Sequence, residues 1–230
     1  MKQHKENVIV KMSDREHCLM RPSMYIGAVD IASKDVFILE NDKFYFKTIS
    51  YNPGFLKIFD EILDNSIDEA IRTNFEFANT ISIYYNNETF TIEDNGRGIP
   101  QSLVDGVPQA VIAFTEARAG SNFNEATKAN GIGTNGIGSF LTNVYSKSFT
   151  VETCDGKNKL TLNSINNAES FTYNIKSTTK KGTSVSFKPD LEKFKMLSVD
   201  NIYFDLIKNR CLHLAQCFPE IKFKLEIEGK

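Results

Sequence analysis

Asp94-Asn95-Gly96-Arg97-Gly98-Ile99-Pro100 is the segment that says most about the architecture of this chain. Residues 88–93, directly before it, are rich in β-branched and aromatic side chains, which predicts a strand. The glycines end that strand and let the backbone approach a ligand closely. An aspartate at a strand end can accept a hydrogen bond from an exocyclic amine. A plain turn after an edge strand is the alternative interpretation, although Arg97-Gly98-Ile99-Pro100 makes the segment less generic.

Upstream of this segment, residues 55–72 carry apolar side chains at three- and four-residue steps, which predicts an amphipathic helix. Its buried positions would be Phe55, Phe59, Ile62, Leu63, Ser66 and Ala70. The sheet would follow at once, because residues 80–85 and 88–93 form a predicted hairpin around Asn86-Asn87, a pair that tolerates positive φ.

The polar side of the predicted helix is strongly acidic. Asp60, Asp64 and Asp68 repeat at i and i+4, and each like-charged pair costs a few tenths of a kcal/mol, so we expect a compensating cation. Glu61, Asn65 and Asp68 lie in one narrow stripe, where a carboxylate and an amide oxygen could share a hard metal such as Mg²⁺. A solvated acidic face is the alternative interpretation.

A third segment, residues 119–138, is polar and glycine-rich and is expected to be a long mobile loop before a helix at 139–145. Gly131 to Gly138 satisfies G-x-G-x-x-G formally, but a dinucleotide fold needs a hydrophobic strand directly before the glycines, and residues 124–130 read as loop. Clustered glycines at a helix start expose several N–H groups, which suits a polyphosphate. A flexible loop without a ligand is the alternative.

The remaining pattern predicts one α+β domain of 230 residues, with residues 1–12 as an N-terminal arm. Ser13-Asp14-Arg15-Glu16 has capping-box spacing, so a short helix is expected to begin there and to end before Pro22. Further strands are expected at 148–153, 159–163, 171–175, 183–187 and 222–227, and a helix at 200–217.

Composition excludes several classes of protein. The net charge of −2 gives no basic field for nonspecific nucleic-acid binding. The four cysteines form no C-x-x-C pair and only three histidines occur, so a zinc site is not expected, and the thiols are expected to be free and buried. Apolar runs are too short for a membrane span and the N-terminus is too polar for a signal peptide, which predicts an intracellular protein without a membrane contact.

Taken in series, the acidic helix, the D-x-G-R-G-I-P segment, the glycine-rich loop and the Gly182-Thr183 strand resemble the GHKL (Bergerat) ATP-binding fold. This implies an α+β sandwich whose mixed, mostly antiparallel sheet is covered on one face by helices, over residues 13–230. Arg21-Pro22-Ser23-Met24-Tyr25-Ile26-Gly27 is similar to the front of type II topoisomerase ATPase domains of the gyrase B type. Residues 53–79 resemble the large subunit of T-even-like bacteriophage topoisomerases, which favours a phage origin.

The resemblance implies roles for individual residues. Glu61 would be the general base, Asn65 would hold Mg²⁺, and Asp94 would accept from the adenine amino group of ATP, with Thr183 helping through its hydroxyl or a water. The other implied nucleotide contacts are Asp68, Glu69, Arg97, Gly98, Ile99, Pro100, Ser121, Asn122, Gly133, Thr134, Asn135, Gly136, Ile137 and Gly138. Among these, Glu69 would pair with Arg97, and the glycine-rich loop would surround the phosphates and sugar.

The resemblance also implies an ATP-driven enzyme. Dimer closure at an N-gate would accompany strand passage of DNA, with a homodimer formed by arm exchange through residues 1–12, and with DNA contacts and other topoisomerase subunits engaged mainly by domains outside this sequence. The family's γ-phosphate lysine comes from a Q-T-K loop in a following transducer domain, and the sequence ends at Lys230. The chain alone is therefore expected to bind ATP but to hydrolyse it poorly. Alternatives are another GHKL member, such as a chaperone, mismatch-repair ATPase or histidine kinase, and a non-catalytic nucleotide-binding module.

Overall fold

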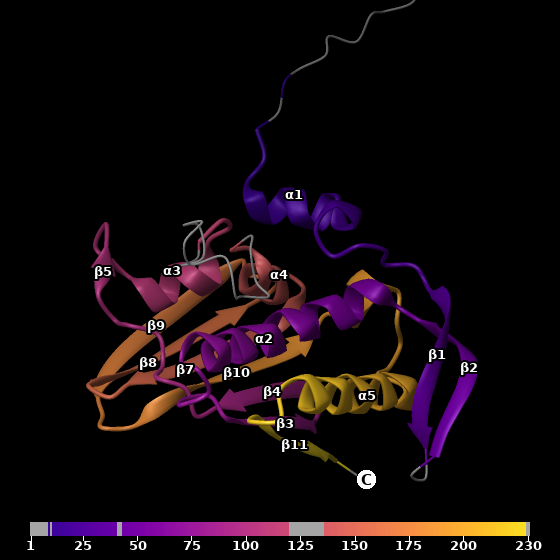
Figure 1. The fold of residues 1–230 in the computed structure, drawn as a ribbon. Coiled ribbons are helices and arrows are strands. Elements are labelled where there is room, and N and C mark those ends of the chain that lie inside the picture. The colour runs from indigo at the N-terminus through magenta and orange to yellow at the C-terminus, as the bar shows by residue number, and fades with distance from the viewer. Residues whose placement is uncertain (1–8, 10, 41–42, 120–135, 229–230) are drawn as a thin grey trace, which may run out of the picture.

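A seven-stranded sheet with helices on one face forms the centre of the computed structural model (Figure 1), which describes residues 9, 11–40, 43–119 and 136–228. The strand order is β11-β3-β4-β10-β7-β8-β9, antiparallel throughout except for the β11–β3 pair. The strands are β3 (Thr80–Asn86), β4 (Thr89–Asp94), β7 (Ser146–Asp155), β8 (Asn158–Ile165), β9 (Ser170–Ser177), β10 (Lys181–Pro189) and β11 (Lys222–Ile227). The predicted α+β sandwich with a mixed, mostly antiparallel sheet is confirmed.

The helices form the second layer. They are α1 (Asp14–Met20), α2 (Pro53–Arg72), α3 (Gln109–Thr115), α4 (Gly138–Val144) and α5 (Asn201–Cys217), with short 3₁₀ turns η1 (Pro22–Met24) and η3 (Leu191–Phe194). In α2, the side chain of Asn52 accepts a hydrogen bond from the Phe55 N–H at 3.0 Å, and Pro53 occupies the first turn, where no N–H is needed. All the apolar positions predicted for this helix are buried.

The N-terminal helix begins as its sequence predicts. The Ser13 hydroxyl accepts from the Glu16 N–H at 3.2 Å, and the Glu16 carboxylate accepts from the Ser13 N–H at 2.8 Å. Tyr145, at the end of α4, donates a hydrogen bond to the Cys18 carbonyl at 2.6 Å, which fastens α1 to the helical layer. The predicted arm at residues 1–12 falls mostly outside the described residues, so the division at residue 13 stays a prediction.

A two-stranded hairpin and a short helix were missed from the sequence. A separate hairpin, β1 (Ala32–Glu40) with β2 (Lys43–Tyr51), stands beside the sheet at the right of Figure 1. Its pattern is hidden because both faces carry apolar residues: Ile38 is buried, whereas Phe37 and Phe46 are exposed. Helix α3 was also missed, since seven residues are too few to show a period.

Smaller differences concern turns and thiols. The β3–β4 turn is formed by Asn87 and Glu88, both at positive φ, so the predicted turn at Asn86-Asn87 is wrong by one residue. The cysteines are free, as expected, but Cys154 is only partly buried and Cys217 is exposed, which corrects the prediction of burial for these two thiols. A two-residue pair, β5 (Leu103–Val104) with β6 (Val107–Pro108), precedes α3. No helix within the described ranges is both long and apolar enough to cross a membrane.

Candidate functional site

Three polar side chains form a row across adjacent strands. In the strand register, Asp94 at the end of β4 is opposite Thr183 in β10, and Thr183 is opposite Thr153 in β7. Directly opposed residues of antiparallel strands point to the same face of a sheet. Thr153 is also opposite the buried Leu160 of β8, so the row faces the helices. A polar row on the apolar side of a sheet indicates a site rather than a core.

Asp94 is held between the sheet and α2. Its two carboxylate oxygens accept hydrogen bonds from the Ser66 hydroxyl and from the Gly96 N–H, each at 2.8 Å. Burial raises the pKa of Asp94, and these hydrogen bonds oppose the rise. Ser66 was predicted only as a small residue on the buried side of the helix, so its role as a donor to Asp94 was missed.

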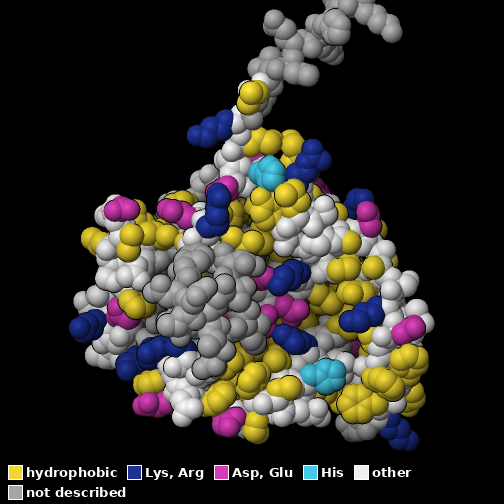
Figure 2. All heavy atoms as spheres, turned by 45° about the horizontal axis from the view of Figure 1, so that its top comes forward, with side chains coloured by type: hydrophobic (Ala, Val, Ile, Leu, Met, Phe, Trp, Pro, Cys, Tyr) yellow, Lys and Arg dark blue, Asp and Glu magenta, His cyan; other side chains and the backbone are white. Residues whose placement is uncertain are grey.

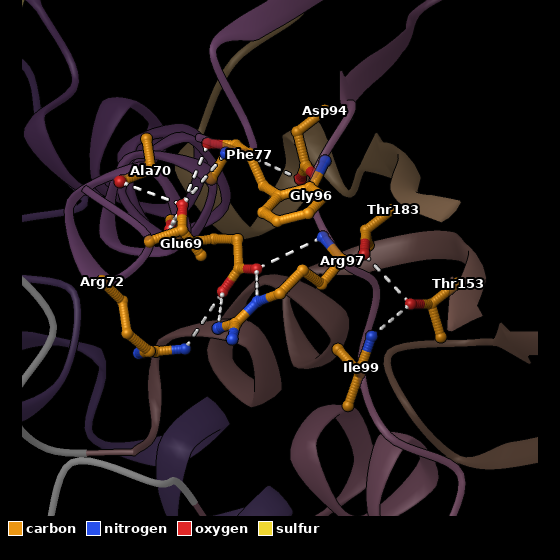
Figure 3. A network of polar contacts seen from close by, with 12 residues as sticks. Glu69, Ala70, Arg72, Phe77, Asp94, Gly96, Arg97, Ile99, Thr153 and Thr183 are labelled. Atoms are coloured by element: carbon orange, nitrogen blue, oxygen red, sulfur yellow. Dashed lines mark hydrogen bonds and ion pairs between the residues drawn. The ribbon is translucent and has the colours of Figure 1, made fainter. Parts of the chain in front are cut away.

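An ion pair fixes the loop that follows Asp94. The Arg97 guanidinium donates to both carboxylate oxygens of Glu69, at 2.7 and 3.1 Å, and the Arg97 N–H donates to the same carboxylate at 3.2 Å (Figure 3). Arg72 lies 3.4 Å from Glu69 on the other side. The structure thus brings together the predicted Glu69–Arg97 pair, and its bidentate geometry orients the loop strongly.

The loop then lies directly against β7. Gly98 has a φ of +76°, and a Cβ at this position would overlap the carbonyl of Cys154, so only glycine fits. The next N–H, that of Ile99, donates to the Thr153 hydroxyl at 2.8 Å, and the Thr153 and Thr183 hydroxyls are 3.0 Å apart (Figure 3). Thr153 was missed from the sequence, because a threonine in a strand carries no signal by itself.

Glu61 lies one turn before Asn65 on the same stripe of α2. Its carboxylate forms an ion pair with Lys57, and a Cβ at Gly138, the first residue of α4, would overlap its other oxygen. The Asn65 amide nitrogen donates to the Ser139 hydroxyl at 2.9 Å, so the amide oxygen is the atom that remains for a ligand. The start of α4 and this stripe of α2 therefore form one polar surface.

The other acidic residues of α2 point to α5. Arg210 donates to Asp64 at 3.0 Å and lies 3.8 Å from Asp60. Burial raises the pKa of Asp60 to about 6, although Arg210 lowers it. Acidic and basic side chains lie next to one another near the centre of the face seen in Figure 2. For Asp60 and Asp64, the guanidinium of Arg210 supplies the compensating positive charge that the sequence predicts.

The predicted site residues divide into two groups. The first group lies around α2 and the ends of β4 and β10, and consists of Glu61, Asn65, Glu69, Asp94, Arg97, Gly98, Ile99, Gly138 and Thr183. Asp68 is buried in α2, and Pro100 is exposed next to Ile99. Gly136 and Ile137 lead into α4. Ser121, Asn122, Gly133, Thr134 and Asn135 lie outside the described residues, as does most of the loop predicted at 119–138. No group of three or more His, Cys, Asp or Glu side chains suited to a metal occurs in the part of the chain that the structure describes.

The part of the chain that contains this site matches a known protein family. Residues 52–193 match the model of the histidine kinase-, DNA gyrase B- and HSP90-like ATPases, from the N-cap of α2 to η3. The chain belongs to this ATPase family. The GHKL resemblance, which rested on four short segments, is thereby confirmed for the whole span that contains the site.

Within this ATPase family the chain is similar to topoisomerases. It is 38% identical over 223 residues to the DNA topoisomerase large subunit of Enterobacteria phage T4, covering 95% of this chain and 42% of the relative. It is 33% identical over 234 residues to DNA topoisomerase 2 of Pisum sativum, covering 97% of this chain and 16% of the relative. The chain therefore spans less than half the length of these curated relatives.

Solved structures of type II topoisomerase ATPase regions are also similar to this chain. The ATPase and transducer domains of topoisomerase II from Balamuthia mandrillaris have a TM-score of 0.89 at 27% identity, covering 97% of this chain and 60% of that chain. The ATPase region of Saccharomyces cerevisiae topoisomerase II bound to ICRF-187 (dexrazoxane) has a TM-score of 0.86 at 28% identity, covering 96% and 61%. The similarity to type II topoisomerase ATPase regions predicted from residues 21–27 is confirmed.

Proposed function

We propose that this chain is the ATP-binding and ATP-hydrolysing region of a type II DNA topoisomerase. The observation that carries the proposal is the carboxylate of Asp94, held on the helix-covered side of the sheet by Ser66 and Gly96. A positioned acceptor at a strand end, beside a glycine loop that a larger residue could not form, is suited to a flat amino-bearing ring.

The base would lie against the row of Asp94 and Thr183. Asp94 would accept from the 6-amino group of adenine, and the Thr183 hydroxyl would contact the neighbouring ring nitrogen directly or through a water. Gly98, Ile99 and Pro100 would line the same side. The Glu69–Arg97 ion pair would keep this loop in place while the base enters.

The phosphates would lie toward α4. Glu61 would act as the general base that accepts a proton from the attacking water, and its ion pair with Lys57 would orient the carboxylate. The Asn65 amide oxygen is a hard ligand of the kind that Mg²⁺ prefers, so the donor present fits the ion. Bound Mg²⁺ would neutralise phosphate charge. The glycine-rich loop with Ser121 and Asn122 would surround the phosphates, with catalysis mainly by position and charge.

For the whole enzyme, we propose that ATP drives closure of a homodimer at an N-gate, with residues 1–12 exchanged between subunits. DNA and other topoisomerase subunits would be bound mainly by domains beyond this chain. The enzyme would act in the cytoplasm of the host cell of a bacteriophage. These statements rest on the similarity to the topoisomerase relatives.

Calorimetric binding of a non-hydrolysable ATP analogue, with and without Mg²⁺, tests the proposal. Asp94→Ala should weaken binding by about tenfold or more, since it leaves the 6-amino group without its acceptor, a loss of roughly 1–3 kcal/mol. Asn65→Ala should reduce the dependence of binding on Mg²⁺. Asp35→Ala, which removes an exposed carboxylate from the β1–β2 hairpin, is the matched control and should bind as the wild type does.

Two results would contradict the proposal. One is a folded Asp94→Ala variant that binds the analogue as tightly as the wild type. The other is a lack of binding both by this chain and by a longer chain that includes the following domain.

A further inference from the structure

Thr153 has an unusual position for a hydroxyl. It is fully buried in β7, with 0% of its surface exposed, and it lies between two parts of the proposed nucleotide site. Its Oγ1 accepts a hydrogen bond from the Ile99 N–H at 2.8 Å, and it is 3.0 Å from the Oγ1 of Thr183 (Figure 3). The hydroxyl therefore connects the loop after Asp94 to β10.

The proton of this hydroxyl can be placed by elimination. A threonine hydroxyl has one proton to donate and two lone pairs to accept with. Within the described ranges, Oγ1 of Thr153 has no hydrogen-bond partners besides Ile99 and Thr183. Ile99 supplies a donor, so the Thr153 proton has one acceptor available, the oxygen of Thr183. A buried proton without an acceptor would cost about 1–3 kcal/mol, so Thr153 donates and Thr183 accepts.

Because Thr183 accepts the hydrogen bond from Thr153, its own hydroxyl proton is available for a different acceptor. The side chain of Thr183 makes no other hydrogen bond in the described part of the chain. On the same face of the sheet, the directly opposed residue of β4 is Asp94, whose two carboxylate oxygens accept hydrogen bonds from Ser66 and Gly96. The row therefore presents an acceptor, Asp94, next to a donor, Thr183.

The two purine classes differ in this pattern. The edge of a 6-aminopurine presents an amino donor next to N1, an acceptor. A 6-oxopurine presents an oxo acceptor next to an N1–H donor, which is the reverse order. The acceptor Asp94 and the donor Thr183 match the 6-aminopurine edge. Against the 6-oxopurine edge, the same row would place acceptor against acceptor and donor against donor.

We propose that Thr153 is a specificity-determining positioning residue, which fixes Thr183 as a hydrogen-bond donor and so favours 6-aminopurine over 6-oxopurine nucleotides. This inference rests on the proposed function, because it requires that the base contacts Asp94 and Thr183. Thr153 itself does not touch the base. It acts through the direction of one hydrogen bond.

Calorimetry with ADP and IDP tests the proposal, since these nucleotides differ only at the 6-position and at N1. In Thr153→Val, the ratio of the ADP to the IDP affinity should fall by about fivefold or more, because the Thr183 hydroxyl is then free to turn either way. Thr153→Ser restores the hydroxyl and should keep the ratio within about twofold of the wild type. Thr91→Val is the matched control, since Thr91 and Ser186 form a similar hydroxyl pair between β4 and β10, 2.8 Å apart.

A role through Thr183 also predicts non-additivity. Thr183→Val should lower the ratio of the ADP to the IDP affinity about as much as Thr153→Val does. In the double variant, this ratio should lie within about twofold of its value in either single variant. A purely structural role for Thr153 would weaken ADP and IDP equally and leave the ratio unchanged. If thermal melting shows that Thr153→Val is unfolded, Thr153→Ala carries the same expectation.

An unchanged ratio in a folded Thr153 variant that still binds ADP would overturn this inference and leave the proposed function standing. A folded wild type that binds neither ADP nor a non-hydrolysable ATP analogue, alone or in a longer chain, would overturn the proposed function itself. The two failures are therefore distinguishable.

Discussion

At the scale of single residues, Gly138 leaves open the space that the Glu61 carboxylate occupies. A Cβ at Gly138 would overlap the end of the Glu61 carboxylate, which is flexible and can move away. Alanine is the better helix former by about 1 kcal/mol, so Gly138→Ala should not destabilise the fold. It should displace the carboxylate from Lys57 and lower kcat for ATP by about tenfold or more. Steady-state kinetics on a chain extended through the next domain would measure this.

Two further measurements make the result interpretable. Binding of the ATP analogue should change by less than about threefold, because the Asp94 end of the site is untouched, and thermal melting should show an intact fold. A variant with unchanged kcat would mean that the position of Glu61 does not matter for hydrolysis.

At the scale of elements, α2 carries two polar stripes, and each stripe faces a different helix. Glu61 and Asn65 face α4, whereas Asp60 and Asp64 face Arg210 on α5. Burial raises the pKa of Asp60 from 3.8 to about 6. The fold therefore prefers protonated Asp60, and this contribution to stability is present below pH 3.8 and lost as the pH rises through about 6.

Asp60→Asn keeps this side chain neutral at every pH. At pH 7 the variant should be more stable than the wild type by about 1 kcal/mol, a value that allows for screening by solvent, and the difference should vanish near pH 4. Urea unfolding at pH 4, 5, 6 and 7 would measure it. Parallel stability curves for the two proteins would contradict the raised pKa.

At the scale of the whole molecule, the residues proposed to contact the base all lie within one layered domain, whereas the curated relatives are much longer. We expect this chain to bind ATP but to hydrolyse it slowly, and a chain extended through the transducer domain to hydrolyse it at least about tenfold faster, since a γ-phosphate lysine would then be supplied. Glu61→Ala in the longer chain should lower the rate by about 100-fold or more. Intact hydrolysis by that variant would refute the assignment of the base.

Most elements from α2 onward were predictable from local patterns, the exceptions being α3 and the short β5–β6 pair. The apolar period of α2, the capping box of α1 and the alternation of β7 to β11 act over a few residues, so they can be recognised without knowing what each element packs against. The motif at Asp94 to Pro100 was predictable for the same reason. The β1–β2 hairpin was not, because its exposed aromatic residues obscure the alternation on which a strand prediction depends.

Local patterns were thus sufficient for the family, the fold class and the individual candidates Glu61, Asn65, Asp94 and Thr183. The connections between them arise only in the folded chain. Ile99 and Thr153 are 54 positions apart, and Asp64 and Arg210 are 146 apart. Such pairs are brought together by strand order and helix packing, which depend on the burial of the whole core and leave no signal at either residue. For this reason the direction of the Thr153 hydrogen bond and the partner of the acidic stripe required the tertiary structure.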